Sequence, residues 1–228
     1  METFEMKNVS IVLLRFMDME TVEKTEPKCR IMRAAFGMFC QCGIKSVSMD
    51  DIAQYLSMSK KTLYKWFKNK DQVVYESTSD YLSRVQQDSM CCISKADNAI
   101  DELFQVLTLT KEVFSNMHPS IFHDLQKYHG DAWQLWMEHK NNFMLEKVRE
   151  NIRRGMAEGL YRKDLDVEVM ARMRLALIEL IFRKDIYPPH QFEISRTQLA
   201  VLEHYMLGMA TLKGHKLINE YKQITEEE

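Results

Sequence analysis

Glycine and proline are scarce in this chain, with 7 Gly and 4 Pro among 228 residues. Helix-breaking residues are therefore rare, and no stretch of strand length alternates polar and apolar side chains. Long apolar runs are also missing. The most apolar run, 175–182, is interrupted by Glu179 and is much shorter than the ~20 residues of a membrane span. These absences predict an all-α fold and no membrane partner.

The motifs of common enzyme classes are missing as well. The sequence contains no glycine-rich phosphate loop, no H-E-x-x-H zinc motif and no nucleophile elbow. The adjacent carboxylates Asp50 and Asp51 are explained by a place at the start of a helix, where negative charge is favoured. We therefore predict no enzymatic activity, no catalytic residue and no cofactor.

Cysteine and histidine do not indicate a disulfide framework or a metal site. Five cysteines, an odd number in a chain of this length, predict a reduced cytoplasmic protein. Cys42 shares an apolar face with Ile31 and Ala35, and buried cysteine behaves as a small hydrophobe. Four histidines between residues 118 and 139 lack the spacing of metal ligands, so no metal is predicted.

The most informative segment that is present is 46–73, SVSMDDIAQYLSMSKKTLYKWFKNKDQV. Ser48, Ser59 and Asn69 are each placed to cap a helix, and Asp51 and Gln72 follow their caps at the reciprocal position of a capping box. Three caps within about 25 residues predict short helices in quick succession. The segment is therefore expected to form two short helices, a tight turn between them, and the start of a third helix.

Packing divides the surfaces of these short helices. The residues expected in their core, at helical spacing, are Ile52, Ala53, Leu56, Leu63 and Phe67. The remaining face of the second helix carries three lysines together with Tyr64 and Trp66. A single lysine is usually an ordinary surface charge, but three beside two aromatic side chains indicate contact with nucleic acid. This combination is typical of a helix-turn-helix in the major groove of DNA.

The segment 31–73 resembles the DNA-binding domain of the TetR family (TetR/AcrR-like) of transcriptional regulators. Residues 59–70, S-K-K-T-L-Y-K-W-F-K-N-K, are similar to the family's pattern S-x-x-T-x-Y-x-x-F-x-x-K. Further positions that carry the resemblance are Ala34, Ala35, Phe39, Gly43, Val47, Ser48, Asp51, Ile52, Ala53 and Asp71. Lys61 departs from the pattern, because the family usually has a small residue there. The resemblance implies an N-terminal three-helix DNA-binding domain followed by a helical-bundle domain for effector binding and dimerisation.

The predicted DNA contacts fall into two groups. Lysine can donate to guanine O6 or N7, so the second helix is expected to read base edges and nearby phosphates. The candidates for these contacts are Lys60, Lys61, Thr62 and Lys65. The candidates for holding phosphates are Ser48, Tyr64, Trp66 and Lys70. Charge agrees with this placement, because residues 26–75 contain nine Lys or Arg against four Asp or Glu in a chain of net charge −2.

The chain is expected to divide into three parts. We assign residues 1–25 to a poorly ordered N-terminal extension, 26–72 to the DNA-binding domain and 73–225 to the effector-binding and dimerisation domain. Met19 is a second possible translation start. We therefore interpret residues 1–18 as the product of an assigned start upstream of the native one. Helices of the larger domain are expected at about 70 to the low nineties, 97–116, 131–158, 167–184 and 195–221.

The resemblance places an effector pocket in the middle of the larger domain. Large apolar side chains gather there, and methionine adapts to irregular shapes, which favours a small apolar or aromatic effector. Most of them are expected to be ordinary core, with only a few lining a cavity. The candidates are Phe104, Leu107, Phe114, Met117, Phe122, Trp133, Trp136 and Met137.

The resemblance also places a homodimer interface on the last two helices, where apolar residues recur at three-and-four spacing. The alternative is that these residues pack within their own subunit. The candidates are Met173, Leu177, Leu199, Leu202, Met206 and Met209. A two-fold dimer would read two half-sites about 34–36 Å apart.

The predicted function is a DNA-binding transcriptional regulator, namely a ligand-responsive repressor that binds a palindromic operator on double-stranded DNA as a homodimer. Two alternatives stay open. One is a helical small-molecule-binding protein whose helix-turn-helix is idle, which the exposed lysines and Tyr64 disfavour. The other is an effector-independent DNA-binding factor, which a filled body without a cavity would favour.

Overall fold

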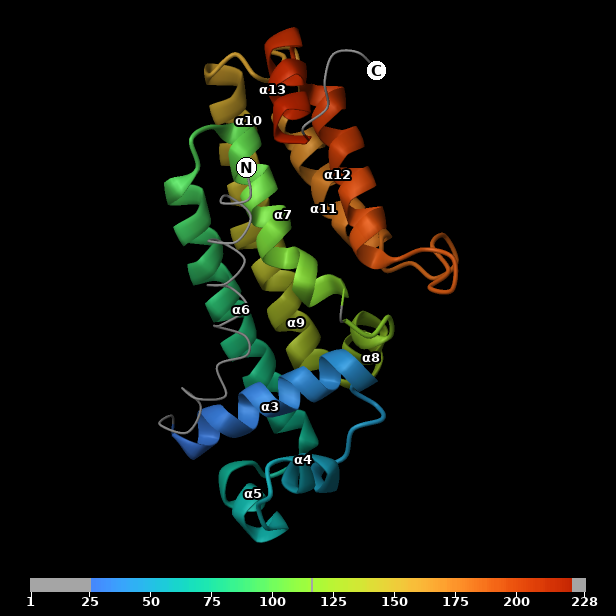
Figure 1. The fold of residues 1–228 in the computed structure, drawn as a ribbon. Helices are drawn as coiled ribbons and strands as arrows, with labels where there is room; N and C mark the ends of the chain where they lie inside the picture. The colour runs from blue at the N-terminus through green and yellow to red at the C-terminus, as the bar shows by residue number, and fades with distance from the viewer. Residues whose placement is uncertain (1–25, 116, 223–228) are drawn as a thin grey trace, which may run out of the picture.

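The computed structural model describes residues 26–115 and 117–222, the side chains of 112–115 apart. The expected extension 1–25 therefore lies outside the described residues. Regular structure within these ranges is helical, with one isolated bridge between Tyr161 and Ala210. The all-α expectation is confirmed (Figure 1).

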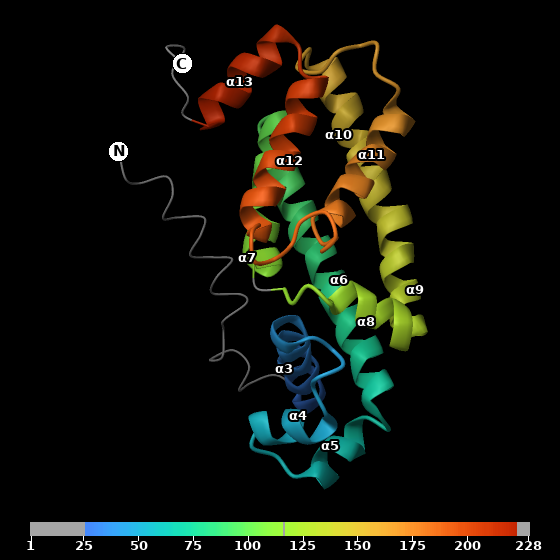
Figure 2. The same ribbon diagram turned by 90° about the vertical axis from the view of Figure 1, so that its right-hand side faces the viewer.

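Three helices form one end of the molecule. They are α3 (Pro27–Cys42), α4 (Met49–Tyr55) and α5 (Lys60–Trp66). Pro27 occupies the first turn of α3, where its missing N–H costs nothing. Helices α4 and α5 lie at the far tip of the molecule, and α3 lies between them and the body (Figures 1 and 2).

The body is built from longer helices. They are α6 (Lys70–Lys95), α7 (Ala99–Ser115), α8 (Ile121–Tyr128), α9 (Gly130–Glu138), the π-helix η1 (His139–Met144), α10 (Leu145–Ala157), α11 (Val167–Leu180), α12 (Ile194–Met209) and α13 (Leu212–Lys222). Helix α6 leaves the DNA-binding end and packs on α7 and α9, and α11 and α12 pack beside α10 and α7 (Figure 2). The short α13 lies at the end opposite α5.

Most expected helices occur within a few residues of their predicted bounds. The expected helix 131–158 is present as α9, η1 and α10 in succession, and Gly159 ends it with a φ of 70°, as its left-handed preference predicts. The single helix expected over 195–221 is wrong, because the chain breaks at Ala210. There the Thr211 N–H donates to the Leu160 carbonyl and the Arg162 N–H donates to the Met209 carbonyl, so a loop takes the backbone groups that would have continued the helix.

Two apolar cores hold the molecule together. The first, which we call the junction core, joins Ala35, Phe39 and Leu63 of the DNA-binding end to Ile121 and Leu125 of α8. The second, the body core, is formed by α7, α10, α11, α12 and α13 around the fully buried rings of Tyr161 and Tyr205. The boundary assigned at residue 72 is therefore not a break in packing, since the junction core spans both sides of it.

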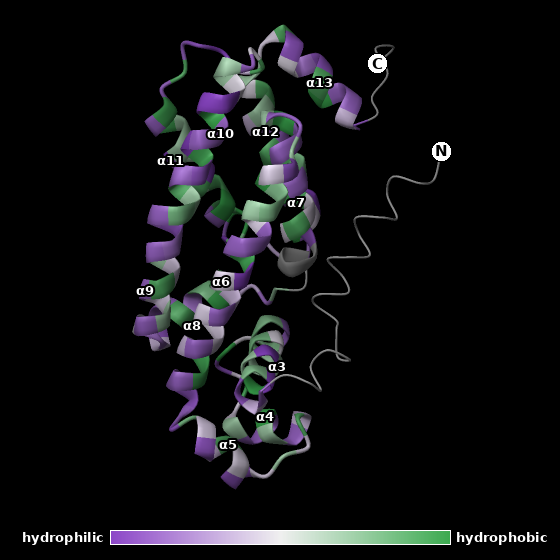
Figure 3. Cartoon of the chain, turned by 90° about the vertical axis from the view of Figure 1, so that its left-hand side faces the viewer, coloured by the Kyte–Doolittle hydropathy of each residue, from purple (hydrophilic) through white to green (hydrophobic). Residues whose placement is uncertain are grey.

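Figure 3 colours the chain by hydropathy and shows hydrophilic residues along the outer faces of α6, α9 and α11. Within the described ranges, every helix is too short or too polar to cross a lipid bilayer.

Candidate functional site

The helix-turn-helix begins at two serine caps. The Ser48 hydroxyl accepts the Asp51 N–H at 3.1 Å, and the Asp51 carboxylate accepts the Ser48 N–H at 2.8 Å, which completes the predicted capping box. The Ser48 hydroxyl and N–H lower the pKa of the Asp51 carboxyl. The Ser59 hydroxyl accepts the Thr62 N–H at 3.1 Å at the start of α5. Both predicted caps are confirmed.

The third predicted cap is confirmed with a different reciprocal contact. The Asn69 side chain accepts the Gln72 N–H at 2.9 Å. The Gln72 side chain, however, accepts the Lys68 N–H rather than the N–H of Asn69 itself. The reciprocal contact at the start of α6 is therefore made to the residue before the N-cap, and not to the N-cap residue as in a capping box.

The apolar face of the short helices packs as predicted. Ile52, Ala53, Leu56, Leu63 and Phe67 are all buried in the junction core. The turn between α4 and α5 contains Ser57, whose φ of 52° is in the left-handed region. Burial of one face and a tight turn fix which side of α5 points away from the protein.

The outer side of α5 carries the predicted DNA-binding side chains. Lys61 and Lys65 are exposed, and Tyr64 and Trp66 are 51% and 39% exposed. Lys60 is also exposed, but its ammonium pairs with the Asp50 carboxylate at 2.6 Å. The Asp50 contact raises the pKa of Lys60. Helix α5, which carries these five residues, lies at the tip of the molecule (Figure 1).

Thr62, Ser48 and Lys70 have partners within the protein. The Thr62 hydroxyl lies 2.8 Å from the Ser59 hydroxyl. The Lys70 ammonium donates to the Ile44 carbonyl at 2.5 Å, and burial lowers its pKa. Lys70 thus ties the start of α6 to the turn between α3 and α4. This contact could not be predicted from the sequence, because it joins residues 26 positions apart.

The match to known families covers this same region. Residues 31–76 match the sequence model of the bacterial regulatory proteins of the tetR family, from α3 into the start of α6. The chain belongs to the TetR family. It is a DNA-binding transcriptional regulator, and the fold of its helical body agrees with solved members of that family.

Three proteins illustrate the similarity of this TetR-family regulator to known ones. The HTH-type transcriptional repressor KstR2 of Mycolicibacterium smegmatis is 26% identical over 145 residues, which are 62% of this chain and 71% of that protein. A putative regulator from Saccharomonospora viridis, solved in complex with choline, has 15% identity and a TM-score of 0.67, with 81% of this chain and 97% of that chain covered. FadR of Thermus thermophilus, solved with lauroyl-CoA, has 17% identity and a TM-score of 0.53, with 81% and 95% covered. The two structural likenesses show a shared fold.

In this TetR-family regulator, helix α8 of the body holds the turn of the DNA-binding end. The Asp124 carboxylate accepts the Lys45 N–H and the Ser120 hydroxyl, both at 3.1 Å. Burial would raise the pKa of Asp124, but these hydrogen bonds and nearby His123 outweigh it and lower the pKa. The His118 N–H donates to the Cys40 carbonyl at the end of α3. We call this set of contacts the α8 latch.

A second contact joins the two parts at the start of α6. The ring Nδ1 of His129, in the short link between α8 and α9, lies 2.7 Å from the Asp71 carboxylate. Gly43 packs closely under the latch, because a Cβ there would lie 2.8 Å from the Ser120 hydroxyl. Polar contacts from α8 and from the α8–α9 link therefore reach both the α3–α4 turn and the start of α6.

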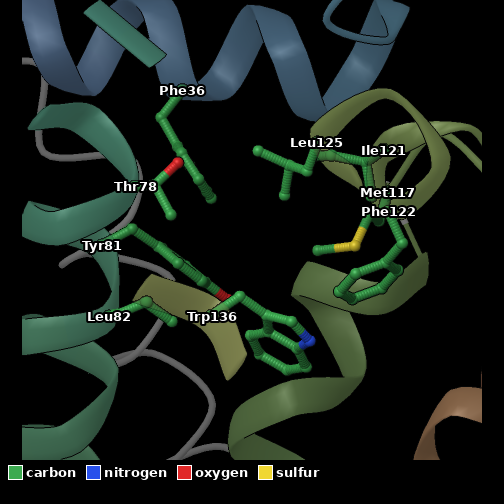
Figure 4. Close-up of a pocket in the computed structure, with 9 residues that line it drawn as sticks. All are labelled: Phe36, Thr78, Tyr81, Leu82, Met117, Ile121, Phe122, Leu125 and Trp136. Carbon is green, nitrogen blue, oxygen red and sulfur yellow. The ribbon is translucent and has the colours of Figure 1, made fainter. Parts of the chain in front are cut away.

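A small cavity lies directly behind the latch. Its volume is about 50 Å³, and its walls come from α3, α6, α8 and α9 (Figure 4). Phe36 of α3 and Tyr81 of α6 stack at 4.1 Å on one side of it. The Trp136 indole N–H is buried and has no hydrogen-bond partner among the described residues. We call this space the junction cavity.

Only part of the predicted effector set lines the junction cavity. Met117, Phe122 and Trp136 do. Phe104 instead stacks on Tyr221 of α13 at 5.2 Å, and Leu107 is part of the body core. Trp133 packs on the junction core, Met137 is half-buried away from the cavity, and the Phe114 side chain lies outside the described residues. Phe36, Thr78, Tyr81, Leu82, Ile121 and Leu125 were missed, because the wall they form comes from segments distant in sequence.

The predicted dimer residues divide in the same way. Met173 and Leu199 are 40% and 41% exposed, and Leu177 is partly exposed. Leu202, Met206 and Met209, in contrast, have no exposed surface and belong to the body core of their own subunit. Placing those three in a dimer interface was wrong, because their side of α12 faces α7 and α11. The alternative of packing within the subunit holds for them.

The cysteines and histidines form no metal site in the part of the chain that the structure describes. All five cysteines are free thiols. Burial raises the pKa of the Cys40 thiol to about 12, so it is protonated and behaves as an apolar side chain.

Proposed function

We propose that this TetR-family regulator is a ligand-responsive repressor that binds a palindromic operator as a homodimer. The observation that carries the proposal is the outer side of α5, where Lys61, Lys65, Tyr64 and Trp66 are exposed while the opposite side is buried. Exposed cations and aromatic rings on a short helix after a tight turn suit the major groove. KstR2 of Mycolicibacterium smegmatis is itself named a repressor, which supports the direction of regulation.

Dimerisation is supported by an apolar face on α11 and α12. Val169 and Met173 on α11 and Leu199 on α12 are each at least 40% exposed. Exposed apolar side chains on two adjacent helices favour burial against a second copy. A two-fold pair of α5 helices would then read two half-sites one turn of DNA apart.

An effector would act through the junction cavity. Trp136 is in the wall of this cavity, and its buried indole N–H has no partner among the described residues, which costs free energy unless an acceptor is supplied. Phe36 of α3 and Phe122 of α8 are both in its walls, so an occupant that widens it would separate these helices. That movement would strain the Asp124 contact to Lys45 and shift α4 and α5. The apolar walls suit the apolar part of a small molecule.

The effector lowers DNA affinity only if it binds the DNA-incompetent arrangement more tightly. A coupling of ~1–3 kcal/mol between the two sites is the usual scale for such regulators. We also propose that the protein acts in the cytoplasm, because bacterial operator DNA is located there.

The test is fluorescence anisotropy with labelled DNA from upstream of the gene and a scrambled duplex, each at two salt concentrations. The expected result is tight binding of two subunits to the upstream DNA and weak, strongly salt-dependent binding to the scrambled duplex. Equal, weak binding to both duplexes would contradict an autoregulating repressor.

Two alternatives make different predictions in the same assay. A protein with an idle helix-turn-helix would bind neither duplex at moderate salt. An effector-independent factor would bind selectively, but no occupant of the body would release it. The junction cavity disfavours the second alternative, because it leaves unfilled space beside the latch.

A further inference from the structure

A second hollow lies on the outer side of the junction cavity, between α6 and the α9–η1 segment. Its volume is about 380 Å³, within the range of small-molecule sites, whereas the 50 Å³ of the junction cavity holds only a few atoms. Leu82 is in the walls of both spaces, so both reach the same side chain. Figure 3 shows the side of the molecule where α6 and α9 are neighbours. We call the outer hollow the α6–η1 groove.

Most of the polar side chains of the groove have no hydrogen-bond partner among the described residues. Within the described residues, five of them make no side-chain hydrogen bond: Ser79, Ser83, Gln86, His139 and Asn142. Hydroxyl and amide groups that converge on one hollow from two helices supply donors and acceptors for a ligand. Leu82, Leu135 and Phe143 add apolar surface beside them.

The charge of the groove restricts what can bind there. Glu138 is one of its lining residues, and in the described part of the chain no Lys or Arg is among them. Gln134 donates to one oxygen of the Glu138 carboxylate at 3.2 Å, which leaves the other oxygen available. Burial lowers the pKa of His139, so its ring is neutral at neutral pH. An anionic ligand would meet a carboxylate with no compensating cation.

The wall on the η1 side has an unusual backbone. His139, Asn142 and Phe143 belong to the π-helix, and the His139 and Phe143 rings lie 5.2 Å apart. π-Helical turns occur mostly as single turns inside α-helices, frequently at functional sites. The wider turn places two aromatic rings and an amide on the same hollow.

We infer that the α6–η1 groove binds a neutral or cationic amphipathic small molecule, with its polar group among the unpartnered side chains and its apolar end against Leu82. The inference deepens the proposed function, because it names the class of effector and the route to the junction cavity. Displacement of Leu82 by the ligand joins the two spaces. Binding in the groove would thereby reach Phe122 and the α8 latch.

The test uses three probes with one aromatic skeleton and different head groups: phenylbutanol, phenylbutyltrimethylammonium and phenylbutyrate. Isothermal titration calorimetry on the full chain, without DNA, measures their affinities. We expect the alcohol and the cation to bind at least about ten-fold more tightly than the anion. Equal affinities, strongest binding of the anion, or no binding of any probe would overturn the inference.

Neighbouring glutamines provide a matched pair of variants. Gln86 lines the groove and Gln87 does not, and both are exposed on α6. Gln86→Phe fills the groove and should lower the affinity for the cationic probe by about ten-fold. Gln87→Phe should leave this affinity unchanged. Glu138→Gln keeps the size and shape of the side chain but removes its charge. It should therefore reduce the difference in affinity between the cationic and the anionic probe. Unchanged probe binding in Gln86→Phe and Glu138→Gln would show that the probes bind elsewhere.

The DNA assay separates this inference from the proposed function. Selective DNA binding with no probe binding would overturn the groove and leave the DNA-binding proposal standing. Probe binding that follows the expected order but leaves DNA affinity unchanged would support the groove and contradict ligand-responsive repression.

Discussion

The two short helices at the tip of the molecule begin differently from four helices of the body. Helices α4 and α5 have seven residues each, and each starts at a serine whose hydroxyl accepts a backbone N–H. In the body, α8, α9, α10 and α12 start with no side-chain cap hydrogen bond among the described residues, whereas Asn69, Asn98 and Asp166 cap α6, α7 and α11. A helix of two turns has few internal hydrogen bonds, so its caps are a large share of its stability. A long helix such as α12 is held by burying Leu202, Met206 and Met209.

The difference predicts where substitutions are tolerated. At the DNA-binding end, local hydrogen bonds should matter about as much as packing. In the uncapped body helices, steric fit should dominate, and single contacts at helix starts should matter little.

Gly155→Ala tests close packing in the body. A Cβ at Gly155 would lie 2.1 Å from Cδ2 of the fully buried Tyr161 ring, so the ring or α10 would have to move. We expect a loss of about 3 kcal/mol in the free energy of unfolding, measured by urea denaturation. Gly37→Ala is the matched control, because a Cβ there meets nothing within 4 Å among the described residues. It should stabilise α3 by roughly 0.5–1 kcal/mol. Similar losses in both variants would contradict the dominance of packing in the body.

Asp124→Asn tests the α8 latch between the two ends. The carboxylate accepts hydrogen bonds from Lys45 and Ser120, so its replacement should cost about 2 kcal/mol at neutral pH. The folded protein lowers the pKa of Asp124 below its unfolded value of about 3.9. Its stabilisation is therefore present above that pH and is lost as the pH falls through the folded value.

The measurement is urea denaturation of the natural chain and the variant in a series of buffers of decreasing pH. The difference in the free energy of unfolding between the two proteins should be largest at neutral pH and should become smaller in acid. A difference that stays constant down to the lowest pH would show that the carboxylate charge does not hold the latch.

Ser48→Ala compares the caps of the two regions directly. Loss of the hydroxyl that accepts the Asp51 N–H should cost about 1 kcal/mol. Glu193→Ala, at the start of the body helix α12, should change stability by much less, because Glu193 makes no side-chain cap hydrogen bond to the described residues. Thermal unfolding of both variants gives the comparison. Equal effects would remove the distinction between capped and packed helices.

Lys65→Ala should have the smallest effect on folding, since the side chain is exposed on α5. Its effect should instead fall on DNA, as relaxed preference at one or two base pairs, each worth about 1–3 kcal/mol. Tyr64→Phe should weaken binding to all duplexes alike. Lys163→Ala, an equally exposed charge in the body, is the control for net charge. The base-reading role of Lys65 would be wrong if its variant lost affinity equally on specific and scrambled DNA.

The sequence was most informative where structure depends on neighbours along the chain. The caps at Ser48, Ser59 and Asn69 and the buried face of α4 and α5 were predictable, because each contact spans only three or four residues. Residue type alone could not say which side of α12 is buried. Leu202 and Leu199 are both leucines at helical spacing, yet one is buried and the other is 41% exposed.

Contacts between distant segments were beyond sequence analysis. The Lys45–Asp124 hydrogen bond joins residues 79 positions apart, and Phe36 and Trp136 meet across the junction cavity from helices far apart in the chain. The break at Ala210 arises in the same way, from a loop around Leu160 that takes its neighbours' backbone hydrogen bonds. Such contacts depend on the complete fold and are not predicted by any local sequence pattern.

The π-helical turn at His139–Met144 also determines which side of the following helix α10 faces the body core. A π turn accommodates an additional residue without changing the direction in which the flanking α-helices face. Removing one residue from this turn should leave a continuous α-helix, with Ile152 and Gly155 of α10 still directed at the body core. Removing one residue from α10 itself would rotate its remainder by about 100° and turn its apolar face to water. The η1 segment is thus a place where the chain can change length while its core keeps register, and where the wall of a groove can be remodelled without rebuilding the fold.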